Sequence, residues 1–305
     1  MQILGLEELV FGVDEVASAA KFLVDYGLTA VDVSAAGGRF EAADGSAVVV
    51  RLSSDPALPE GLGKSPAIRE TVYAVADAAT LDQIEAEISK DRVVTRGADG
   101  SVALRDDFGF ALRFQISRRR PVKPAPLEPQ LNVPGVLPGL EAKPVTLSHV
   151  VYFVPDSARA EAFYRDRLGF VTTDTFENVG PFMRAPAQAD HHAVFFIQTP
   201  PFMQGVEHFT FHMHSAGDVL LAGQAFVQKG YKSFWGPGRH IFGSNWFWYF
   251  NSPLGCNIEY DAEMDQHDET WTGRTLPMTP ETAQILLFAG AEKWIPGPGK
   301  KPPGV

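Results

Sequence analysis

At 305 residues the chain is about twice as long as a typical single domain, which favours a two-domain protein with a sizeable core. Hydrophobic residues make up 45% of the sequence and charged residues 21%, which excludes a disordered or fibrous protein. The net charge of -11 argues against nucleic acid or an anionic membrane as the main partner, because both select for clustered Lys and Arg.

The N-terminal residues do not have the pattern of a secretory signal. Glu7, Glu8 and Asp14 lie where such a signal carries Lys or Arg, and the sequence has no run of about 18 apolar residues that would cross a membrane. The single cysteine, Cys256, fits a reducing compartment, and its apolar neighbours favour a structural thiol over a nucleophile. We therefore expect a cytoplasmic protein.

Four stretches of the sequence share one pattern, a short strand, an amphipathic helix and three further short strands. In chain order, the strand 6–13 precedes a helical stretch 14–28, and a second strand and helix begin at Glu70. The same pair returns with the strand 147–154 and the helical stretch 155–170, and again from Glu207. Asp14 and Asp156 stand where helix N-caps belong.

The ends of the two halves agree as well. The closing strands 106–114 and 251–260 each contain a turn with Gly followed by an apolar segment. The sequence therefore predicts an α+β protein of two similar domains, each built of two βαβββ modules.

Residues 119–145 separate the halves. They contain seven prolines and no persistent hydrophobic period, which indicates an extended linker, and the basic run 118–120 leads into it. The predicted divisions are an N-terminal domain 1–118, the linker 119–145, a C-terminal domain 146–265 and a tail 266–305. In the tail, Thr279 and Pro280 predict the start of a short helix from Glu281 to about Trp294.

All eight histidines lie in the second half of the chain, although the halves repeat one fold. They occupy positions 149, 191, 192, 208, 212, 214, 240 and 267. Histidines that served only as core or surface residues would be divided between the halves. The asymmetry predicts that the C-terminal domain carries the chemistry and that the N-terminal domain is a support that binds no metal.

The repeat indicates which of these histidines form a site. His149 is the third residue of its module's first strand, His208 has the equivalent place in the next module, and Glu259 lies on that module's last strand. Equivalent strand positions of two paired modules face each other across a cleft, so the three side chains are predicted to meet. Two imidazoles and one carboxylate form the facial triad that leaves positions of Fe(II) open, and Mn(II) accepts the same ligands.

The first half differs at the matching positions, which are Glu8, approximately Thr71, and Arg113. Arginine cannot ligate a cation. A lone histidine on a strand is more often a core residue than a ligand, but an acid in the cleft, such as Glu259, needs a cation or another partner to offset its desolvation. The three residues together therefore predict a metal site.

These residues resemble the vicinal-oxygen-chelate superfamily and, within it, the type I extradiol dioxygenases, which open catechol rings with O2. The likeness extends over nearly the whole chain, and its most specific part is the stretch GRHIFGSNWFWYFNSPLGCNIEY from Gly238. The residues at the family's spacing are His240, Tyr249, Pro253, Gly255 and Glu259. Trp248 and Ser252 depart from the family's usual residues and leave the substrate class open.

The resemblance also implies roles for the remaining site residues. His192, the second of a tandem pair, is expected to be the acid/base, and His240 and Tyr249 are expected to hold a substrate oxygen. Strand alternation sends Phe247 to the same face as Tyr249, so it is expected to contact the substrate. The implied reactants are a small aromatic diol and O2, which would meet at Fe(II). We also expect a homo-oligomer of undetermined size and, from the net charge, no binding to nucleic acid or membrane.

Two other functions remain open at this point. A metal-dependent lyase or isomerase of the glyoxalase kind would work without O2, but such enzymes usually have a second glutamate among four ligands, and the second half offers only Glu259 at a module end. A ligand-sequestering protein without catalysis would generally lack the metal ligands. Dependence of the activity on O2 and on metal separates the three.

Overall fold

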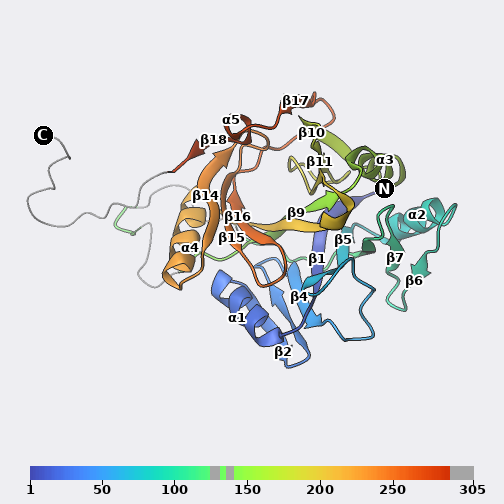
Figure 1. Ribbon diagram of the computed structural model, residues 1–305, viewed down its shortest axis with the longest axis horizontal. Coiled ribbons are helices and arrows are strands. Elements are labelled where there is room, and N and C mark those ends of the chain that lie inside the picture. Colours follow the sequence, from blue (N-terminus) through green and yellow to red (C-terminus); the bar gives the residue numbers. More distant parts are fainter. Residues whose placement is uncertain (124–130, 135–140, 289–305) are drawn as a thin grey trace, which may run out of the picture.

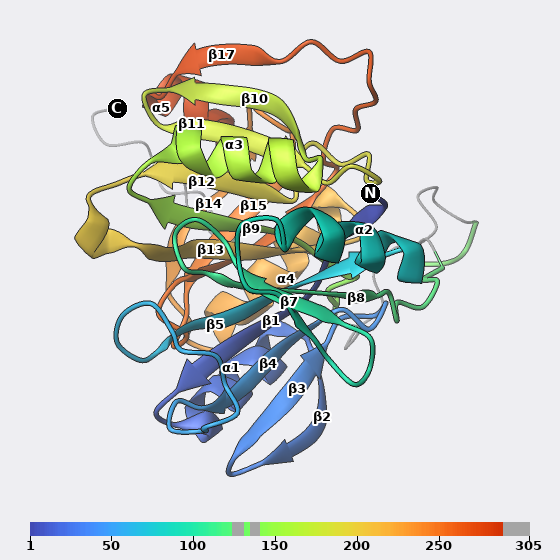
Figure 2. The same cartoon turned by 90° about the vertical axis from the view of Figure 1, so that its right-hand side faces the viewer.

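Two mixed β-sheets, one from each half of the chain, form the centre of the computed structural model (Figure 1). The structure describes residues 1–123, 131–134 and 141–288. In the side view of Figure 2 the second half lies above the first, and strand β1 of the first sheet runs close to β9 of the second.

The first half forms an eight-stranded sheet in the order β2-β3-β4-β1-β5-β8-β7-β6. Its elements are β1 (Ile3–Val13), α1 (Val16–Tyr26), β2 (Thr29–Ser34), β3 (Gly37–Glu41), β4 (Ala47–Leu52), β5 (Ala67–Val75), α2 (Ala78–Ile88), β6 (Thr95–Arg96), β7 (Val102–Arg105) and β8 (Ala111–Ile116).

The second half forms a ten-stranded sheet in the order β17-β10-β11-β12-β9-β13-β16-β15-β14-β18. Its elements are β9 (Thr146–Val154), α3 (Ser157–Leu168), β10 (Val171–Glu177), β11 (Gly180–Arg184), β12 (Val194–Gln198), a 3-10 turn (Pro201–Met203), β13 (Gly205–His212), α4 (Ala216–Gln228), β14 (Ser233–His240), β15 (Trp246–Asn251), β16 (Asn257–Ala262), β17 (Arg274–Pro277), α5 (Pro280–Ala283) and β18 (Gln284–Leu287).

The two sheets confirm the predicted repeat. The order β10-β11-β12-β9-β13-β16-β15-β14 in the second sheet repeats the order β2-β3-β4-β1-β5-β8-β7-β6 of the first sheet. Each βαβββ module contributes one half of a sheet. In each half, parallel pairs join the first and last strands of a module, as in β1 with β4 and β9 with β12. The fold is therefore the α+β arrangement of two similar halves. The limits of the domains stay a prediction.

The tail adds strands to the second sheet. Strand β17 pairs with β10 at one edge and β18 pairs with β14 at the other. The helix predicted from Glu281 is wrong beyond Ala283, because the segment Gln284–Leu287 forms β18 instead. Pairing with the open edge of β14 overrides the helical preference of this segment. The rest of the predicted helix, to about Trp294, lies outside the described residues.

The helix starts follow the sequence only in part. Asp156 caps α3, where its side chain accepts a hydrogen bond from the amide of Arg159. The corresponding prediction for Asp14 is wrong, because Glu15 is the N-cap residue of α1 and the Asp14 carboxylate accepts a hydrogen bond from Ser53 instead. Contact with a neighbouring loop therefore decides the role of Asp14.

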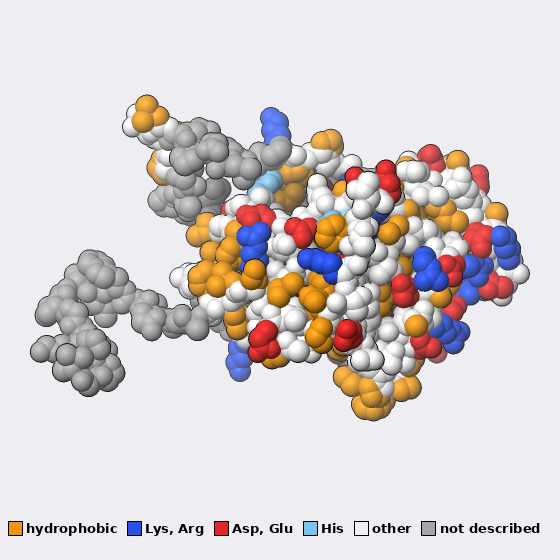
Figure 3. Space-filling model, turned by 90° about the horizontal axis from the view of Figure 1, so that it is seen from above, with side chains coloured by type: hydrophobic (Ala, Val, Ile, Leu, Met, Phe, Trp, Pro, Cys, Tyr) orange, Lys and Arg blue, Asp and Glu red, His pale blue; other side chains and the backbone are white. Residues whose placement is uncertain are grey.

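The basic run at the end of the first half is held by acidic groups. Arg120 forms an ion pair with Glu41, and Arg119 lies near Glu7 and Asp44. On the face shown in Figure 3, acidic and basic side chains are interspersed. Within the described part of the chain, no helix is long and apolar enough to cross a membrane.

An aromatic contact ties the first half to the last strand of the second. The rings of Tyr26 and Tyr260 stack with centroids 3.9 Å apart. The Tyr26 hydroxyl donates to the backbone oxygen of Glu259 at 2.6 Å, and the Tyr260 hydroxyl donates to the backbone oxygen of Tyr26 at 2.7 Å. Both side chains are buried, so strand β16 is braced by helix α1 of the other half.

Replacing Tyr26 by Phe is expected to lower the free energy of unfolding by about 1 to 2 kcal/mol, because it removes one buried hydrogen bond and keeps the stacked ring. Urea unfolding of the full chain measures this loss. The control is Tyr231→Phe, which removes a hydroxyl that bonds to the partly exposed Asp25 and should cost less. An equal loss in both variants would contradict the bracing role of Tyr26.

Candidate active site

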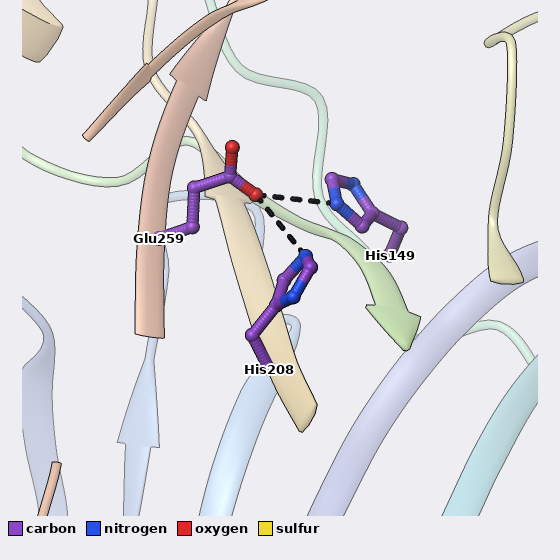
Figure 4. A group of neighbouring side chains, drawn as sticks. All are labelled: His149, His208 and Glu259. Carbon is purple, nitrogen blue, oxygen red and sulfur yellow. Dashed lines mark ion pairs between the residues drawn. The ribbon is translucent and has the colours of Figure 1, made fainter. Parts of the chain in front are cut away.

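Three side chains from three strands of the second half meet at one point (Figure 4). His149 lies on β9, His208 on β13 and Glu259 on β16, and one ligand atom from each lies within 4.8 Å of the others. Glu259 Oε2 is 3.3 Å from His149 Nε2 and 3.5 Å from His208 Nε2. The three side chains meet as their equivalent positions in the paired modules predicted.

These spacings suit a bound cation. Ligand atoms at about 2.1 Å from an octahedral metal lie roughly 3 Å from one another, close to the separations around Glu259. Glu259 Oε1 and His208 Nε2 are buried without a hydrogen-bond partner among the described residues. Glu259 Oε2 faces both imidazoles, so a cation between the three side chains would satisfy His208 Nε2, and the donor set fits a 2-His-1-carboxylate metal centre.

Electrostatics keeps the carboxylate ready to bind. Burial opposes ionisation of Glu259, but the imidazoles around it, His149 and His240 first, hold its pKa well below the usual range. Burial lowers the pKa of His149 and favours the neutral ring that a metal requires. Burial also disfavours a charge on His208, but Glu207 outweighs it and raises the pKa of His208.

A second set of polar side chains orients the three ligands. Ser148 Oγ lies 2.9 Å from His149 Nδ1, and the Glu207 carboxylate bonds to His208 Nδ1, so that both Nε2 atoms face the centre. Thr210 donates to Glu259 Oε2 at 2.5 Å and lies 2.9 Å from His149 Nε2. Sequence reasoning missed these residues, although Ser148 and Glu207 each immediately precede a predicted ligand.

The centre lies at the wall of a cavity of about 360 Å³ on the concave face of the second sheet. The side chains that surround it are His149, Val151, Phe153, Phe176, Phe182, His192, Phe195, Ile197, Glu207, His208, Phe234, Trp235, His240, Phe242, Asn245, Tyr249, Met278 and Ala283. Most are apolar or aromatic, and the polar ones gather near the three ligands. Met278 and Ala283 come from the tail, which therefore helps to close the cavity.

The structure brings His192, His240 and Tyr249 to this cavity, as the resemblance implied. His240 Nδ1 donates to the backbone oxygen of Ala283 at 3.0 Å, and its Nε2 lies 3.1 Å from the Tyr249 hydroxyl. Burial, reinforced by Glu259, raises the pKa of Tyr249 well above 10, so its hydroxyl stays a hydrogen-bond donor. His192 is 3% exposed, and its ring centroid is 4.1 Å from that of His149.

Phe247 has a different place from the one expected. It is fully buried and is not among the residues that line the cavity. Its ring stacks on His240 with centroids 4.1 Å apart and lies 5.5 Å from Tyr249. As alternation predicts, Trp248 lies on the opposite face, where it packs closely against Gly223 of α4. Phe247 therefore supports the two polar residues from behind.

His212 does not join the centre. Its ring bonds to Asp261 at 2.6 Å and lies 3.4 Å from Asp190. Burial disfavours a charge on this ring, but the two carboxylates, Asp261 first, raise its pKa well above the usual range. Asp261 also accepts a hydrogen bond from Asn245 at 3.1 Å, which fixes that amide at the cavity wall. Sequence reasoning missed Asn245.

The matching positions of the first half form an ion-pair cluster. Val10 of β1 is equivalent to Val151 of β9, because each lies two residues after the matched pair Glu8 and His149. Val10 pairs with Glu70 of β5, and Val151 pairs with His208 of β13. The counterpart of His208 is therefore Glu70 and not Thr71. The Arg113 guanidinium lies 2.9 Å from Glu70 and 3.5 Å from Glu8. An internal cation thus occupies the place that a metal would take in the second half.

Four βαβββ modules with a His, His, Glu set on the concave face of one pair define a metalloprotein of the vicinal-oxygen-chelate fold. Residues 146–260 match the model of the Glyoxalase/Bleomycin resistance protein/Dioxygenase superfamily, and the chain carries a domain of that superfamily.

Two ring-cleaving dioxygenases have sequences similar to that of this chain. Metapyrocatechase 2 from Cupriavidus necator is 36% identical over 122 residues, which cover 40% of this chain and 38% of the relative. Biphenyl-2,3-diol 1,2-dioxygenase from Paraburkholderia xenovorans (strain LB400) is 29% identical over 214 residues, 65% of this chain and 70% of the relative. The match thus spans well under half the length of the first relative and about two thirds of the second.

Solved structures share the fold. A Mn(II)-bound glyoxalase from Novosphingobium aromaticivorans has a TM-score of 0.76 at 21% identity, covering 99% of this chain and 97% of its own. A halotolerant catechol dioxygenase has a TM-score of 0.73 at 18% identity, covering 94% and 99%. At these identities the likeness concerns the fold alone.

Proposed function

We propose that this protein is an Fe(II)-dependent extradiol dioxygenase that cleaves a catechol-type ring with O2 in the degradation of aromatic compounds in the cytoplasm. The arrangement that carries the proposal is the set His149, His208 and Glu259 beside an apolar cavity that also presents His192, His240 and Tyr249. The similarity to relatives named metapyrocatechase and biphenyl-2,3-diol dioxygenase supports it.

His149, His208 and Glu259 would hold the metal. A bound Fe(II) would supply a centre at which two adjacent diol oxygens and O2 come together. The Tyr249 hydroxyl and the His240 ring, 3.1 Å apart, would hold one diol oxygen and orient the ring. His192, which lines the cavity and packs against His149, would take a diol proton and return it to the product.

The cavity favours diols with an apolar substituent. Of the described residues that line it, none is Lys or Arg, whereas Val151, Phe195 and Ile197 form an apolar wall. An ionised acid on the substrate would have to leave water without a cationic partner. We therefore propose neutral catechols with a hydrocarbon or aryl group as the substrates.

A metal-dependent lyase or isomerase is the second candidate, because a Mn(II)-bound glyoxalase shares the fold. Such a site would take a second carboxylate, and Glu207 is the carboxylate among the described residues that line the cavity. Both oxygens of Glu207 are occupied, one by His208 Nδ1 and the other by Asn257 at 3.0 Å. This observation disfavours Glu207 as a fourth ligand.

The deciding experiment follows O2 uptake by protein loaded anaerobically with Fe(II), with catechol, 2,3-dihydroxybiphenyl and a trihydroxybenzene added in turn. We expect O2 consumption equal to the diol consumed and a new yellow chromophore, fastest with 2,3-dihydroxybiphenyl. The same protein loaded with Mn(II) tests the choice of metal. Stoichiometric metal binding without O2 uptake from any diol would reject the dioxygenase and favour the lyase or isomerase.

A further inference from the structure

A chain of buried hydrogen bonds leads from His192 away from the cavity. His192 Nδ1 lies 3.0 Å from His191 Nδ1, and His191 Nε2 lies 2.9 Å from Asp174 Oδ2. The three residues are 3%, 0% and 1% exposed. They come from the segment before β12 and from β10, so two separate parts of the sheet meet behind the cavity.

The outer end of this chain is fixed by the tail. The Arg274 backbone amide donates to Asp174 Oδ1 at 2.7 Å, and its guanidinium donates to Oδ2 at 2.5 Å. Burial opposes ionisation of Asp174, but His191 and Arg274 hold its pKa below the usual range. Asp174 is therefore a carboxylate, which only accepts hydrogen bonds.

The positions of the hydrogens follow from this acceptor. His191 must donate from Nε2 to Asp174, and because burial lowers the pKa of His191, its ring is neutral and Nδ1 has a lone pair. His192 must then donate from its own Nδ1 to His191. A neutral His192 with hydrogen on Nδ1 has its lone pair on Nε2.

We propose that Asp174 and His191 are positioning residues that fix His192 in the tautomer whose Nε2 is a bare acceptor toward the cavity. This inference rests on the proposed function, in which His192 meets the diol. With this tautomer His192 begins turnover as a base: the O–H bond of the diol breaks and an N–H bond forms at Nε2. The charge left on the imidazole is offset through His191 by Asp174, and the same proton then returns to the product.

The alternative is that the Asp174–His191 pair only braces the loop before β12. The change Asp174→Asn separates the two roles. The Arg274 backbone amide, which donates to Oδ1, would hold the carbonyl oxygen of the new side chain at that position, so its NH2 group would face His191 Nε2 and donate there. His191 would then carry its hydrogen on Nδ1 and donate to His192. His192 would then carry hydrogen on Nε2 and could not accept a proton there, whereas a role in bracing alone would leave the tautomer unchanged.

The test combines a spectroscopic and a kinetic readout on the full chain. In Zn(II)-loaded protein with 15N-labelled histidine, NMR distinguishes a protonated from a bare ring nitrogen. We expect hydrogen on Nδ1 of His192 in the wild type and on Nε2 in Asp174→Asn. In Fe(II)-loaded protein we expect Asp174→Asn to lower kcat by roughly 10²-fold with the KM for the diol nearly unchanged, the scale of one lost general base.

Two further variants keep the result decisive. Asp190→Asn alters a half-buried carboxylate whose bonds go to Gln188, His212 and Gln266 and not to His191 or His192, so it should leave the His192 tautomer unchanged. If Asp174→Asn does not fold, His191→Phe replaces it: the phenyl ring cannot accept from His192 Nδ1, so we expect the preference for hydrogen on Nδ1 to be lost, and a His192 that keeps it would overturn the inference.

The outcomes separate this inference from the proposed function. A wild type that cleaves no diol rejects the proposed function, while the NMR result still decides the tautomer. A wild type that cleaves diols, together with an Asp174→Asn variant that keeps either its kcat or the Nδ1-protonated His192, overturns the inference.

Discussion

We expect the replacement of Glu259 by Gln to abolish stoichiometric metal binding and, with it, ring cleavage. The Glu259 carboxylate is fully buried and lies within 3.5 Å of both histidine ligands, and within the described part of the chain it is the one carboxylate of the ligand set. A neutral amide of the same size removes that charge and keeps the packing. We expect the metal affinity to fall by at least about 100-fold, because even residues behind the ligands are worth roughly 10- to 100-fold.

Metal content after anaerobic loading and gel filtration measures this effect directly, without reference to catalysis. Thermal unfolding provides a second readout, because a metal that binds only the native state raises the Tm of the wild type but not of the variant. The matched control is Glu70→Gln, which removes a carboxylate from the ion-pair cluster at the matching site of the first half, where Glu70 is the counterpart of His208, and should leave one metal per chain. A Glu259→Gln variant that retains one tightly bound metal would contradict the assigned ligand set.

The two halves show what the metal site requires beyond the fold. Both halves have the same strand order, yet the first places Glu8, Glu70 and Arg113 where the second has His149, His208 and Glu259. The two carboxylates are balanced by two arginines, because Arg113 pairs with both and Arg39 also pairs with Glu8, so the cluster keeps no net negative charge to attract a cation. The same backbone therefore supports an ion pair in one half and a metal centre in the other.

The repeat made the fold and the three ligands predictable from the sequence. Hydrophobic periodicity identified the modules, and equivalent positions in paired modules must face each other, so His149 and His208 were placed together without any contact information. The counterpart of His208 was misplaced by one residue because β1 and β5 pair with register shifts, which periodicity does not show. A slip of one residue changes the face of a side chain.

The residues behind the ligands could not be found in this way. Asp174 reaches His191 across 17 positions of sequence, and Asn245 reaches Asp261 across 16, so each contact depends on how the strands curve. Arg274 belongs to a tail whose pairing with β10 has no counterpart in the first half. The repeat supplies no template for contacts that only one half makes.

Replacing His192 by Phe is the second change for which we expect a large effect, a fall in kcat of roughly 10²- to 10⁴-fold with one metal still bound. His192 is buried against His149 but is not one of the three ligands, and burial, reinforced by the neighbouring histidines, holds its pKa well below 6.5. A phenyl ring keeps the aromatic packing with Phe182, whose centroid is 5.0 Å away, and removes both ring nitrogens.

Single-turnover experiments isolate the affected step, because anaerobic titration with the diol reports binding and a subsequent pulse of O2 reports cleavage. We expect diol binding to change little and product formation to slow. The matched control is His214→Phe, a histidine that precedes α4 and does not line the cavity, which should leave both steps unchanged. Cleavage at the wild-type rate in His192→Phe would remove His192 from the chemistry, whereas loss of the metal would show that the ring supports the ligands instead.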